Sequence, residues 1–351
     1  MNGTIYMPVG EVCSSISDTY REKKNMVTLI NTSDVLEGRV LNHERVPNSN
    51  LKGQFKKTFQ RDDILYSEIR PQNRRFAYVD FSPIDYIAST KLMVIRAKKD
   101  VVSPKYLYYF LKNSSTVAEL QLLAETRSGT FPQITFSEVA NLTIPVPSLA
   151  VQEVIVQTMQ CLEDKITCNE QINDNLQQQA FSVFDNLIAN AENNDYTVSD
   201  YAFLNPKRTL AKNQVARSID MSQLSTSGAF PSGWEMKPFN GGMRFTNGDT
   251  LLARITPCLE NGKTAFIDFL DDGEVAFGST EYIVLAPKND TPPEMLYCLA
   301  RYPAFVDYAV KNMNGSSGRQ RVSAETVGQY RLPLFDKHSL VLFKEVVSPM
   351  F

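Results

Sequence analysis

Asp63-Ile-Leu-Tyr-Ser-Glu-Ile-Arg-Pro71 returns, with substitutions, as Asp249-Thr-Leu-Leu-Ala-Arg-Ile-Thr-Pro257, and this duplicated stretch decides the fold. Further matches follow in the same order at a nearly constant spacing: Phe76–Phe81 with Thr264–Phe269, Ser89-Thr90 with Ser279-Thr280, Pro104–Tyr108 with Pro293–Tyr297, Ser128-Gly129 with Ser317-Gly318, Ile134-Thr135 with Val322-Ser323, and Ile144-Pro145 with Leu332-Pro333. An ordered set of this kind indicates a duplicated globular unit rather than a solenoid of short repeats. Two similar units suggest a pseudo-twofold arrangement, suited to a partner with two related half-sites.

The bulk properties indicate an ordinary globular chain of two or three domains. Among the 351 residues there is no run of about 18 apolar residues, so a membrane span is not expected. The first residues lack the basic and apolar regions of a secretory signal. The five cysteines are scattered without a Cys-x-x-Cys pair, which favours reduced structural cysteines and a cytoplasmic location.

The charge is unevenly distributed, although the net charge is only −3. Residues 149–195 contain eight acidic side chains and a single basic one, Lys165. Basic residues gather in both repeats: Lys52, Lys56, Lys57, Arg61, Arg70, Arg74 and Arg75 in the first, and Lys207, Arg208, Lys212, Arg217, Arg319 and Arg321 in the second. Two basic lobes with an acidic connector can bind a polyanion through the lobes alone. Each cluster taken singly could equally be a solvated face.

Each repeat has the pattern of a mixed α/β (α+β) domain. Apolar runs rich in β-branched and aromatic residues predict strands at Ala77–Phe81, Leu92–Ile95, Ala265–Phe269 and Tyr282–Leu285. Prolines at 104 and 293 open amphipathic stretches that predict one helix each, Tyr106–Leu123 and Met295–Val310. A glycine-rich loop, a short helix (137–141 or 324–328) and a strand ending in proline (142–147 or 330–333) then follow.

Between the repeats, residues 149–191 contain no proline or glycine and predict one helix of about 40 residues, roughly 60 Å long. Residues at the 4-3 spacing of a coiled-coil seam are Ile155, Met159, Leu162, Ile166, Asn169, Asn173, Leu176, Ala180, Val183 and Leu187. The two asparagines either fix the register of a helix pair or face solvent. A narrow seam predicts at least one partner helix. Residues 337–351 begin a second such helix that is cut short, so self-association through the unpaired seam is also possible.

The search for catalytic motifs finds none that context supports. With His43 and His338 as the only histidines, a metal site or a Ser/His or Cys/His pair is not expected. Gly-x-Gly-x-x-Gly, a Walker loop and Gly-x-Ser-x-Gly are absent, and Asn205-Pro206-Lys207-Arg208 is not an adenine-methylation motif. The sequence therefore predicts a chain that is not an enzyme and binds no cofactor.

Five stretches carry a resemblance to a known family. Gly248–Lys263, followed by Phe277-Gly-Ser-Thr-Glu-Tyr282, resembles the target-recognition domain of type I restriction-modification specificity subunits (HsdS-like). Phe131–Thr135, Ile144–Pro147 and Val151–Val156 resemble that family's entry into its spacer helix. The resemblance implies target-recognition domain 1 at residues 1–148, a long spacer helix at 149–192, target-recognition domain 2 at 193–336 and the start of a second, truncated spacer at 337–351.

The resemblance also implies a function, namely reading the two halves of a bipartite DNA target. The spacer helix would fix the gap between the halves and dock methyltransferase subunits, which carry S-adenosylmethionine and methylate adenine. A restriction subunit would complete the complex through them. Two other classes stay open: a coiled-coil adaptor whose paired lobes bind protein, and, less favoured by the motif search, a nuclease within one lobe.

The residues that we expect at the DNA interface lie in matched loops. In the first repeat they are Arg70, Gln72, Asn73, Arg74, Arg75, Arg127 and Thr130; in the second they are Arg254, Thr256, Lys263, Arg319, Gln320 and Arg321, with Asn261 beside them. The alternative for each of these positions is an exposed loop residue that makes no functional contact. The repeated segments Ser89-Thr90-Lys91 and Ser279-Thr280-Glu281 are also candidates, but strand packing explains them better. Because lobes that read different sequences must differ where they touch bases, we expect base-reading residues in the unmatched segments 34–59 and 213–242, which include Trp234.

Overall fold

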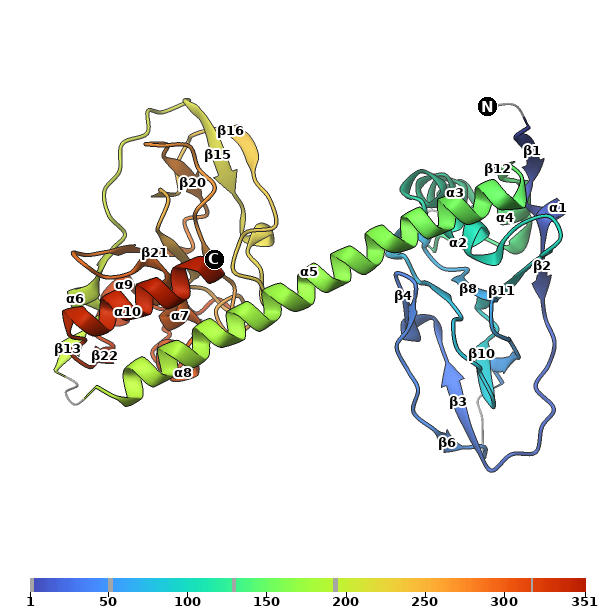
Figure 1. Ribbon diagram of the computed structural model, residues 1–351, viewed down its shortest axis with the longest axis horizontal. Helices are drawn as coiled ribbons and strands as arrows, with labels where there is room; N and C mark the ends of the chain where they lie inside the picture. Colours follow the sequence, from blue (N-terminus) through green and yellow to red (C-terminus); the bar gives the residue numbers. More distant parts are fainter. Residues whose placement is uncertain (1–2, 50–52, 128–130, 192–194, 317) are drawn as a thin grey trace. The chain divides into compact units, whose positions relative to one another are not determined.

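The computed structural model describes residues 3–49, 53–127, 131–191, 195–316 and 318–351. The chain divides into two compact units, Met1–Lys165 (unit 1) and Ile166–Phe351 (unit 2). Figure 1 colours unit 1 from blue to green and unit 2 from green to red. Each unit has its own sheets, helices and buried apolar clusters.

Unit 1 contains two four-stranded sheets and a short sheet that joins its beginning to its end. The first sheet has the antiparallel order β2-β11-β8-β9, and the second has the order β6-β3-β10-β7, in which β3 and β10 are parallel. β1 pairs with β12, and β4 with β5. The strands are β1 (Ile5–Pro8), β2 (Cys13–Ile16), β3 (Met26–Ile30), β4 (Val35–Leu36), β5 (Arg39–Val40), β6 (Val46–Pro47), β7 (Phe55–Lys57), β8 (Ile64–Ser67), β9 (Phe76–Tyr78), β10 (Tyr86–Ser89), β11 (Leu92–Ala97) and β12 (Thr143–Val146).

Unit 2 repeats the topology of the two four-stranded sheets and of the β1-β12 pair, but has no counterpart of the β4-β5 pair among its described residues. Its sheets have the orders β14-β21-β18-β19 and β16-β15-β20-β17, and β15 and β20 are the parallel pair. β13 pairs with β22, as β1 pairs with β12. The strands are β13 (Tyr196–Thr197), β14 (Ala202–Leu204), β15 (Val215–Ile219), β16 (Glu235–Pro238), β17 (Met243–Phe245), β18 (Thr250–Ala253), β19 (Thr264–Phe266), β20 (Ala276–Gly278), β21 (Tyr282–Pro287) and β22 (Arg331–Leu332). The expected mixed α/β fold with a duplicated unit is therefore confirmed.

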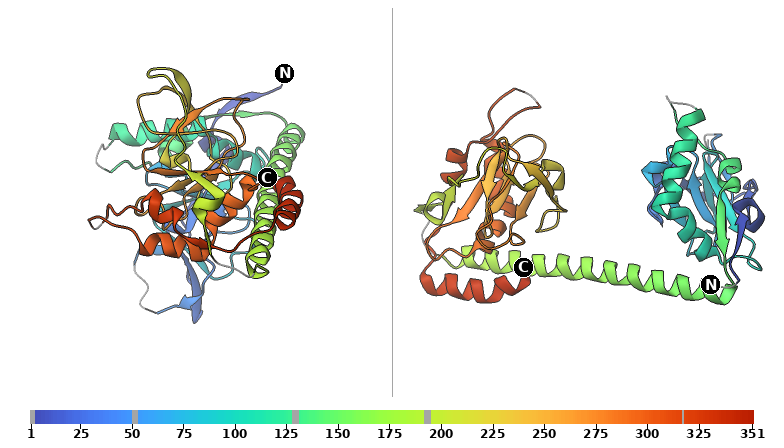
Figure 2. Two further views of the ribbon diagram at one scale, coloured as in Figure 1. Left: turned by 90° about the vertical axis from the view of Figure 1, so that its left-hand side faces the viewer. Right: turned by 90° about the horizontal axis from the view of Figure 1, so that it is seen from above.

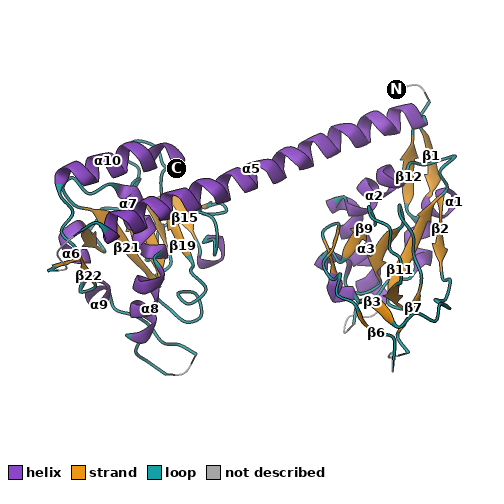
Figure 3. Cartoon of the chain, turned by 60° about the horizontal axis from the view of Figure 1, so that its bottom comes forward, coloured by secondary structure: helices purple, strands orange, loops and turns teal. Residues whose placement is uncertain are grey.

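In each unit a helix packs on the first sheet: α2 on β9 and β11 in unit 1, and α7 on β18, β19 and β21 in unit 2 (Figure 3). Unit 1 has α1 (Val9–Val12), α2 (Pro104–Lys112), α3 (Ser114–Arg127) and α4 (Phe136–Asn141); unit 2 has α6 (Val198–Tyr201), α7 (Pro293–Arg301), α8 (Pro303–Lys311), α9 (Ala324–Gly328) and α10 (Lys337–Val347). Short 3-10 turns η1 (Thr32–Asp34), η2 (Pro71–Asn73), η3 (Met221–Gln223) and η4 (Ser348–Met350) complete the elements. Among the described residues, no helix has the length and apolar character needed to cross a membrane.

The two predicted single helices at 106–123 and 295–310 were wrong, because each is broken into two. In unit 2, Pro303 begins α8, and the ring of a proline excludes the helical conformation from the residue before it, so Tyr302 is extended at φ −65° and ψ 124°. In unit 1 no proline is involved. Asn113 is extended instead, and its Oδ1 accepts a hydrogen bond from Ser115 N at 2.9 Å, which caps α3.

The long helix α5 (Leu149–Ala189) has 41 residues, as the sequence predicts. Its first turns belong to unit 1, where the Gln152 side chain is fully buried. Gln152 Oε1 accepts from Ser103 N at 2.8 Å, and its Nε2 donates to the carbonyls of Val101 and Pro147. These bonds fasten the start of α5 to the start of α2.

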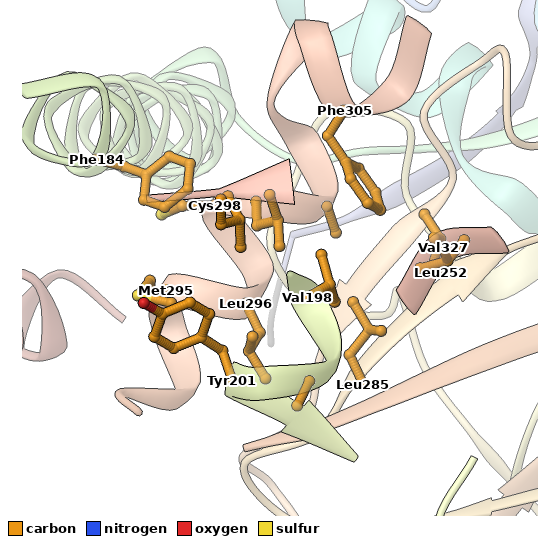
Figure 4. Close-up of a cluster of buried hydrophobic side chains, with 14 of the residues drawn as sticks. Phe184, Val198, Tyr201, Leu252, Leu285, Met295, Leu296, Cys298, Phe305 and Val327 are labelled. Carbon is orange, nitrogen blue, oxygen red and sulfur yellow. The ribbon is translucent and has the colours of Figure 1, made fainter. Parts of the chain in front are cut away.

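The last turns of α5 belong to the core of unit 2. Ala180 and Phe184 are buried, and the Phe184 ring lies 5.7 Å from that of Tyr302 and 6.3 Å from that of Phe343 on α10. Figure 4 shows Phe184 reaching from α5 toward Cys298 on α7. α10 lies alongside this part of α5 (Figure 2). By contrast, every residue of α5 from 168 to 175 is exposed.

A buried ion pair stands at the start of the central strand in both units. Asp63 and Asp249 occupy matched positions, and each accepts a backbone hydrogen bond at 2.8 Å from the residue three places earlier. Arg96, from β11, pairs with Asp63 at 2.7 Å, whereas Arg208, from the loop after β14, pairs with Asp249 at 2.5 Å. The carboxylate has therefore kept its place while the arginine comes from a different element in each unit.

Candidate nucleic-acid interface

The loop after β8 carries five of the predicted DNA-binding residues and has an unusual backbone. Arg70 and Arg74 flank the single turn η2, and both adopt the left-handed conformation, with φ of 43° and 52°. This conformation costs a non-glycine residue about 1–2 kcal/mol, and such strain is concentrated at functional sites. The side chains of Arg70, Gln72 and Asn73 are exposed. Within the described residues, no hydrogen bond or ion pair holds the Arg70 guanidinium.

Arg74 and Arg75, from the same loop, are instead held by protein groups. Arg74 Nη2 donates to Ser114 Oγ at 2.7 Å, at the start of α3. Arg75 Nη1 donates to the carbonyl of Ser33 at 3.0 Å, within η1. Lys263, which matches Arg75 in unit 2, likewise donates from Nζ to the Met221 carbonyl of η3 at 2.7 Å. Arg75 and Lys263 thus make equivalent hydrogen bonds between matched loops of the two units. A DNA contact by either residue stays a prediction.

In both units three segments meet beside this loop, and we call this place the junction. In unit 1, Glu68 N donates to Lys91 O, Ile134 N to Glu68 O and Arg70 N to Pro132 O, at 2.9 to 3.1 Å. In unit 2 the matched bonds join Arg254 N to Glu281 O, Val322 N to Arg254 O and Thr256 N to Gln320 O, each 3.0 Å long. The structure therefore brings the predicted residues Arg254, Thr256, Gln320 and Arg321 together at one place.

The junction side chains of unit 2 form a charged cluster. Arg321 forms a bidentate ion pair with the Glu281 carboxylate, with Nε 2.9 Å from Oε2 and Nη2 2.7 Å from Oε1. This guanidinium holds the pKa of Glu281 below its ordinary value, and Arg254 acts in the same direction. Arg254 Nε is buried and has no hydrogen-bond partner among the described residues. In unit 1, Lys91 Nζ lies 3.5 Å from Glu68 Oε2 and donates to Gln133 Oε1 at 3.1 Å.

Sequence reasoning missed Glu68 and Gln133 at the junction. Lys91 and Glu281 belong to the repeated segments 89–91 and 279–281, which were weighed as candidates but for which strand packing was the favoured explanation. The structure gives Ser89 and Ser279 the same turn-forming role, since their Oγ atoms accept from Lys91 N at 3.3 Å and Glu281 N at 3.1 Å. The reversal of charge between Lys91 and Glu281, at matched positions after a shared serine, was the signal in the sequence that could have marked them.

The glycine-rich loops are described only in part. Thr130 lies outside the described residues; Arg127 ends α3, and its side chain also lies outside them. In unit 2 Arg319 is exposed, and its N–H donates to Ser316 O at 3.0 Å. Gly318, just before it, has φ of +79°, a conformation that an L side chain rarely adopts. The glycine thus permits a sharp turn that presents Arg319 to solvent.

The unmatched segments, where base-reading residues are expected, contain aromatic rings that reach solvent. Trp234, directly before β16, is 43% exposed, and the Arg217 guanidinium lies 4.8 Å from its ring centre. Arg217 is held in turn by Glu274 and, at 3.2 Å, by Asp271. In unit 1, the exposed His43 ring packs edge-on against Phe81 at 5.2 Å. Base reading by these segments stays a prediction.

The predicted seam of α5 is largely uncovered in this chain. Ile155, Met159, Leu162 and Ile166 are 37 to 59% exposed, and Asn169 is exposed. Leu176, Val183 and Leu187 are half-buried, and the last two line a groove of about 580 Å³ between α5 and α10. The buried residues that anchor the helix lie mostly off the seam: they are Gln152, Val156, Ala180 and Phe184, of which the predicted seam includes only Ala180.

Arg70→Gly and Arg70→Ala form a matched test of this strained loop. Both variants lose the guanidinium, but only glycine adopts the left-handed conformation without strain, so we expect Arg70→Gly to be about 1 kcal/mol more stable than Arg70→Ala in denaturant unfolding. If Arg70 contacts a phosphate, both should also lower the slope of log affinity against log salt by about 0.9. Equal stabilities would contradict the strain, and wild-type salt dependence would contradict the phosphate contact.

Comparison with known proteins places this geometry in a family. Among the described residues there is no group of three or more His, Cys, Asp and Glu side chains arranged to hold a metal ion. Residues 6–178 match the type I restriction modification DNA specificity domain. The specificity subunit of the type I restriction enzyme HindI from Haemophilus influenzae is 43% identical over 158 residues, which cover 45% of this chain and 34% of that protein.

Further matches agree with these. The specificity subunit of the type I restriction enzyme EcoAI from Escherichia coli is 33% identical over 133 residues, covering 36% of this chain and 22% of that protein. The matched parts thus span about a third or less of these curated relatives. The fold is that of the type I restriction-modification S subunit from M. genitalium, with a TM-score of 0.54 at 15% identity over 99% of this chain and 90% of that one. Residues 6–178 of this chain therefore belong to the HsdS-like family of type I restriction-modification specificity proteins.

Proposed function

We propose that this protein is the DNA sequence-recognition subunit of a type I restriction-modification complex and reads the two halves of a bipartite target. The observation that supports this most strongly is that the two units share the topology of their four-stranded sheets but carry different charged side chains at the same junction. The family match of residues 6–178 agrees with it. Two lobes of one architecture suit two half-sites, and differences at matched positions suit two different base sequences.

In this proposal, exposed cations set the position of each unit on the DNA. In unit 1, Arg70 projects from a turn with a strained backbone; in unit 2, Arg319 projects from a turn that Gly318 permits. Both arginines are exposed. Such side chains neutralise phosphates and give affinity that falls with salt, whereas polar groups at base edges in the major groove supply specificity. Candidates for a phosphate contact or for a base contact lie next to these cations: Gln72, Asn73, Thr256 and Gln320. Arg127 and Thr130 are further candidates for these two roles.

The spacer helix has the features of a docking surface for protein. Its seam exposes Ile155, Met159, Leu162 and Ile166, and the groove beside α10 is lined by Leu187, Leu342 and Val346. We expect methyltransferase subunits to cover these apolar side chains, and the length of α5 to fix the gap between half-sites. Adenine methylation, with S-adenosylmethionine, then belongs to those subunits, restriction subunits join through them, and this chain supplies no catalytic group.

The proposal is tested by co-expressing the chain with its cognate methyltransferase subunits and mapping methylated adenines across a genome. A bipartite motif with a fixed gap is the expected result. Arg70→Glu combined with Arg319→Glu should abolish methylation while the subunits still co-purify, whereas Met159→Asp combined with Ile166→Asp should abolish co-purification. A single palindromic half-motif would contradict reading by two units. Absence of sequence-specific methylation by a complex that assembles would contradict the function itself.

A protein-binding adaptor is the second candidate, because the exposed apolar seam also suits helices other than those of a methyltransferase, a second copy of this chain included. The charge reversals discriminate between the two functions. An adaptor would keep all its partners and activities when Arg70 and Arg319 are reversed. If the protein is an adaptor, the wild type should also bind random-sequence DNA no more tightly than the variant with Arg70→Glu and Arg319→Glu. This comparison is made at low salt, where phosphate contacts are strongest.

A further inference from the structure

The junction is the place where the two units share a backbone frame and differ in charge. Its three matched backbone hydrogen bonds have lengths between 2.9 and 3.1 Å in both units. The same short antiparallel bridge joins Ile69 to Gln133 in unit 1 and Ile255 to Arg321 in unit 2. Side chains at these positions therefore start from equivalent main-chain positions in equivalent turns.

At the junction, all three matched side chains change their charge. Glu68 of unit 1 is matched by Arg254, Lys91 by Glu281, and Gln133 by Arg321. Unit 1 thus presents a carboxylate, an ammonium and an amide, with no net charge. Unit 2 presents two guanidinium groups and a carboxylate, with a net charge of about +1. In each unit these groups contact or electrostatically influence one another.

Elsewhere in the frame, three pairs of matched positions keep their chemistry. Asp63 and Asp249 both accept from the backbone and pair with an arginine, Ser89 and Ser279 both accept at a turn, and Arg75 and Lys263 both donate to a 3-10 turn. A group that maintains the fold is expected to be alike in both units. A group that distinguishes one half-site from the other must differ, and the junction fulfils that condition.

The side chains also reach solvent. Lys91 is 50% exposed and Arg321 is 40% exposed, while their carboxylate partners Glu68 and Glu281 are 20% and 26% exposed. Ion pairs with this much exposure contribute little to stability, so stability alone does not explain why both units place one here. The predicted phosphate-contacting residues Arg70 and Arg319 are adjacent in the chain to the junction segments of their units.

We propose that the junction residues Glu68, Lys91 and Gln133 in unit 1, and Arg254, Glu281 and Arg321 in unit 2, are specificity-determining residues that contact base edges; this rests on the proposed function. The fork of Arg321 matches the O6 and N7 acceptors of guanine, and Glu281 holds that fork in plane until DNA replaces it. The amide of Gln133 matches the N6 and N7 edge of adenine.

The experiment exchanges the residues between units. Arg321→Gln places the amide of unit 1 in unit 2, and Gln133→Arg does the reverse; each is assembled with the cognate methyltransferase subunits, and its target is mapped by methylation and by selection from random duplexes. Arg321→Gln should lower the preference for guanine at one base pair of one half-site roughly 5- to 150-fold. Gln133→Arg should alter only the other half-site. Arg331→Gln, an exposed charge removed from β22, is the matched control and should change neither.

Arg321→Lys covers the case in which Arg321→Gln does not fold, because it keeps the charge beside Glu281 but loses the fork, and it too should lose guanine preference. Unchanged base preference in a folded variant would overturn the inference. So would equal weakening on all sequences, which is the behaviour of a phosphate contact. Both outcomes leave the proposed function standing. That function fails separately, if the wild-type complex shows no sequence-dependent methylation.

Discussion

Replacing Phe184 by alanine is expected to lower the free energy of unfolding of unit 2 by about 3–5 kcal/mol. Phe184 is 1% exposed and packs between the rings of Tyr302 and Phe343, so alanine would leave a cavity where α5 meets α7 and α10. Trp234 is the only tryptophan of the chain and lies in unit 2. Its fluorescence during denaturant unfolding therefore reports on this unit alone.

Ile166→Ala on the same helix is the matched control for that measurement. Ile166 is 59% exposed, and truncation of an exposed side chain usually changes stability by less than about 0.5 kcal/mol. Ile166→Ala should therefore unfold like wild type yet bind methyltransferase subunits more weakly. A small effect of Phe184→Ala, comparable with that of the control, would show that the last turns of α5 are not part of the core of unit 2.

Replacing Arg208 by methionine is expected to destabilise unit 2 by about 3–5 kcal/mol at neutral pH, because it leaves the carboxylate of Asp249 buried without its counter-charge. The Asp249 side chain is only 1% exposed and lies 2.5 Å from Arg208. Thr246 N continues to donate to it in the variant, but one backbone hydrogen bond does not replace a guanidinium. Trp234 fluorescence again follows the unfolding of this unit.

The loss should depend on pH, with a definite sign. Burial already raises the pKa of the Asp249 carboxyl above its ordinary value, although Thr246 N and Arg208 oppose the shift. Between the unfolded and the folded pKa the native state binds more protons than the unfolded state, so stability falls as pH rises. Removal of Arg208 raises the folded pKa further and widens that window. Arg208→Met should therefore be least destabilised near pH 4 and most destabilised above pH 7.

Arg208→Met combined with Asp249→Asn is the control, because the amide keeps an acceptor for Thr246 N and carries no charge. The double variant should recover much of the lost stability and should lose the pH dependence that Asp249 causes. Equal destabilisation of Arg208→Met at pH 4 and pH 8 would show that the loss comes from packing of the arginine stem rather than from the unpaired carboxylate.

The sequence was sufficient for the repeated topology because the matches fall on strand β8 and its counterpart β18, on the turns that follow them, and on the helices that begin at prolines. It was also sufficient for α5, since 41 residues without proline or glycine have few alternatives. The break at Asn113 could not be predicted in the same way as that at Pro303. It depends on the Asn113 side chain, which accepts a hydrogen bond from a backbone N–H. The free energy of this bonded turn differs only slightly from that of an uninterrupted helix.

The site was only partly predictable for a related reason. A basic loop residue such as Arg75 or Lys263 has the same appearance in the sequence whether it faces DNA or clamps a neighbouring carbonyl. Likewise, the apolar stripe of α5 gave one seam, although the helix is anchored by Gln152 in unit 1 and by Phe184 in unit 2, off that seam. A helix that serves two cores presents a different face to each, and a single periodicity cannot represent both.

The exposed stretch of α5 at residues 168–175 has a consequence for how such genes evolve. Gln152 fastens the helix upstream of it and Phe184 fastens it downstream, so a recombination crossover within this stretch transfers each core intact. The two parental halves then need to agree only on the number of residues between these anchors, since each added residue turns an α-helix by about 100°. Exchange of gene segments at this stretch can therefore combine one unit from each parent without a single compensating mutation in either hydrophobic core.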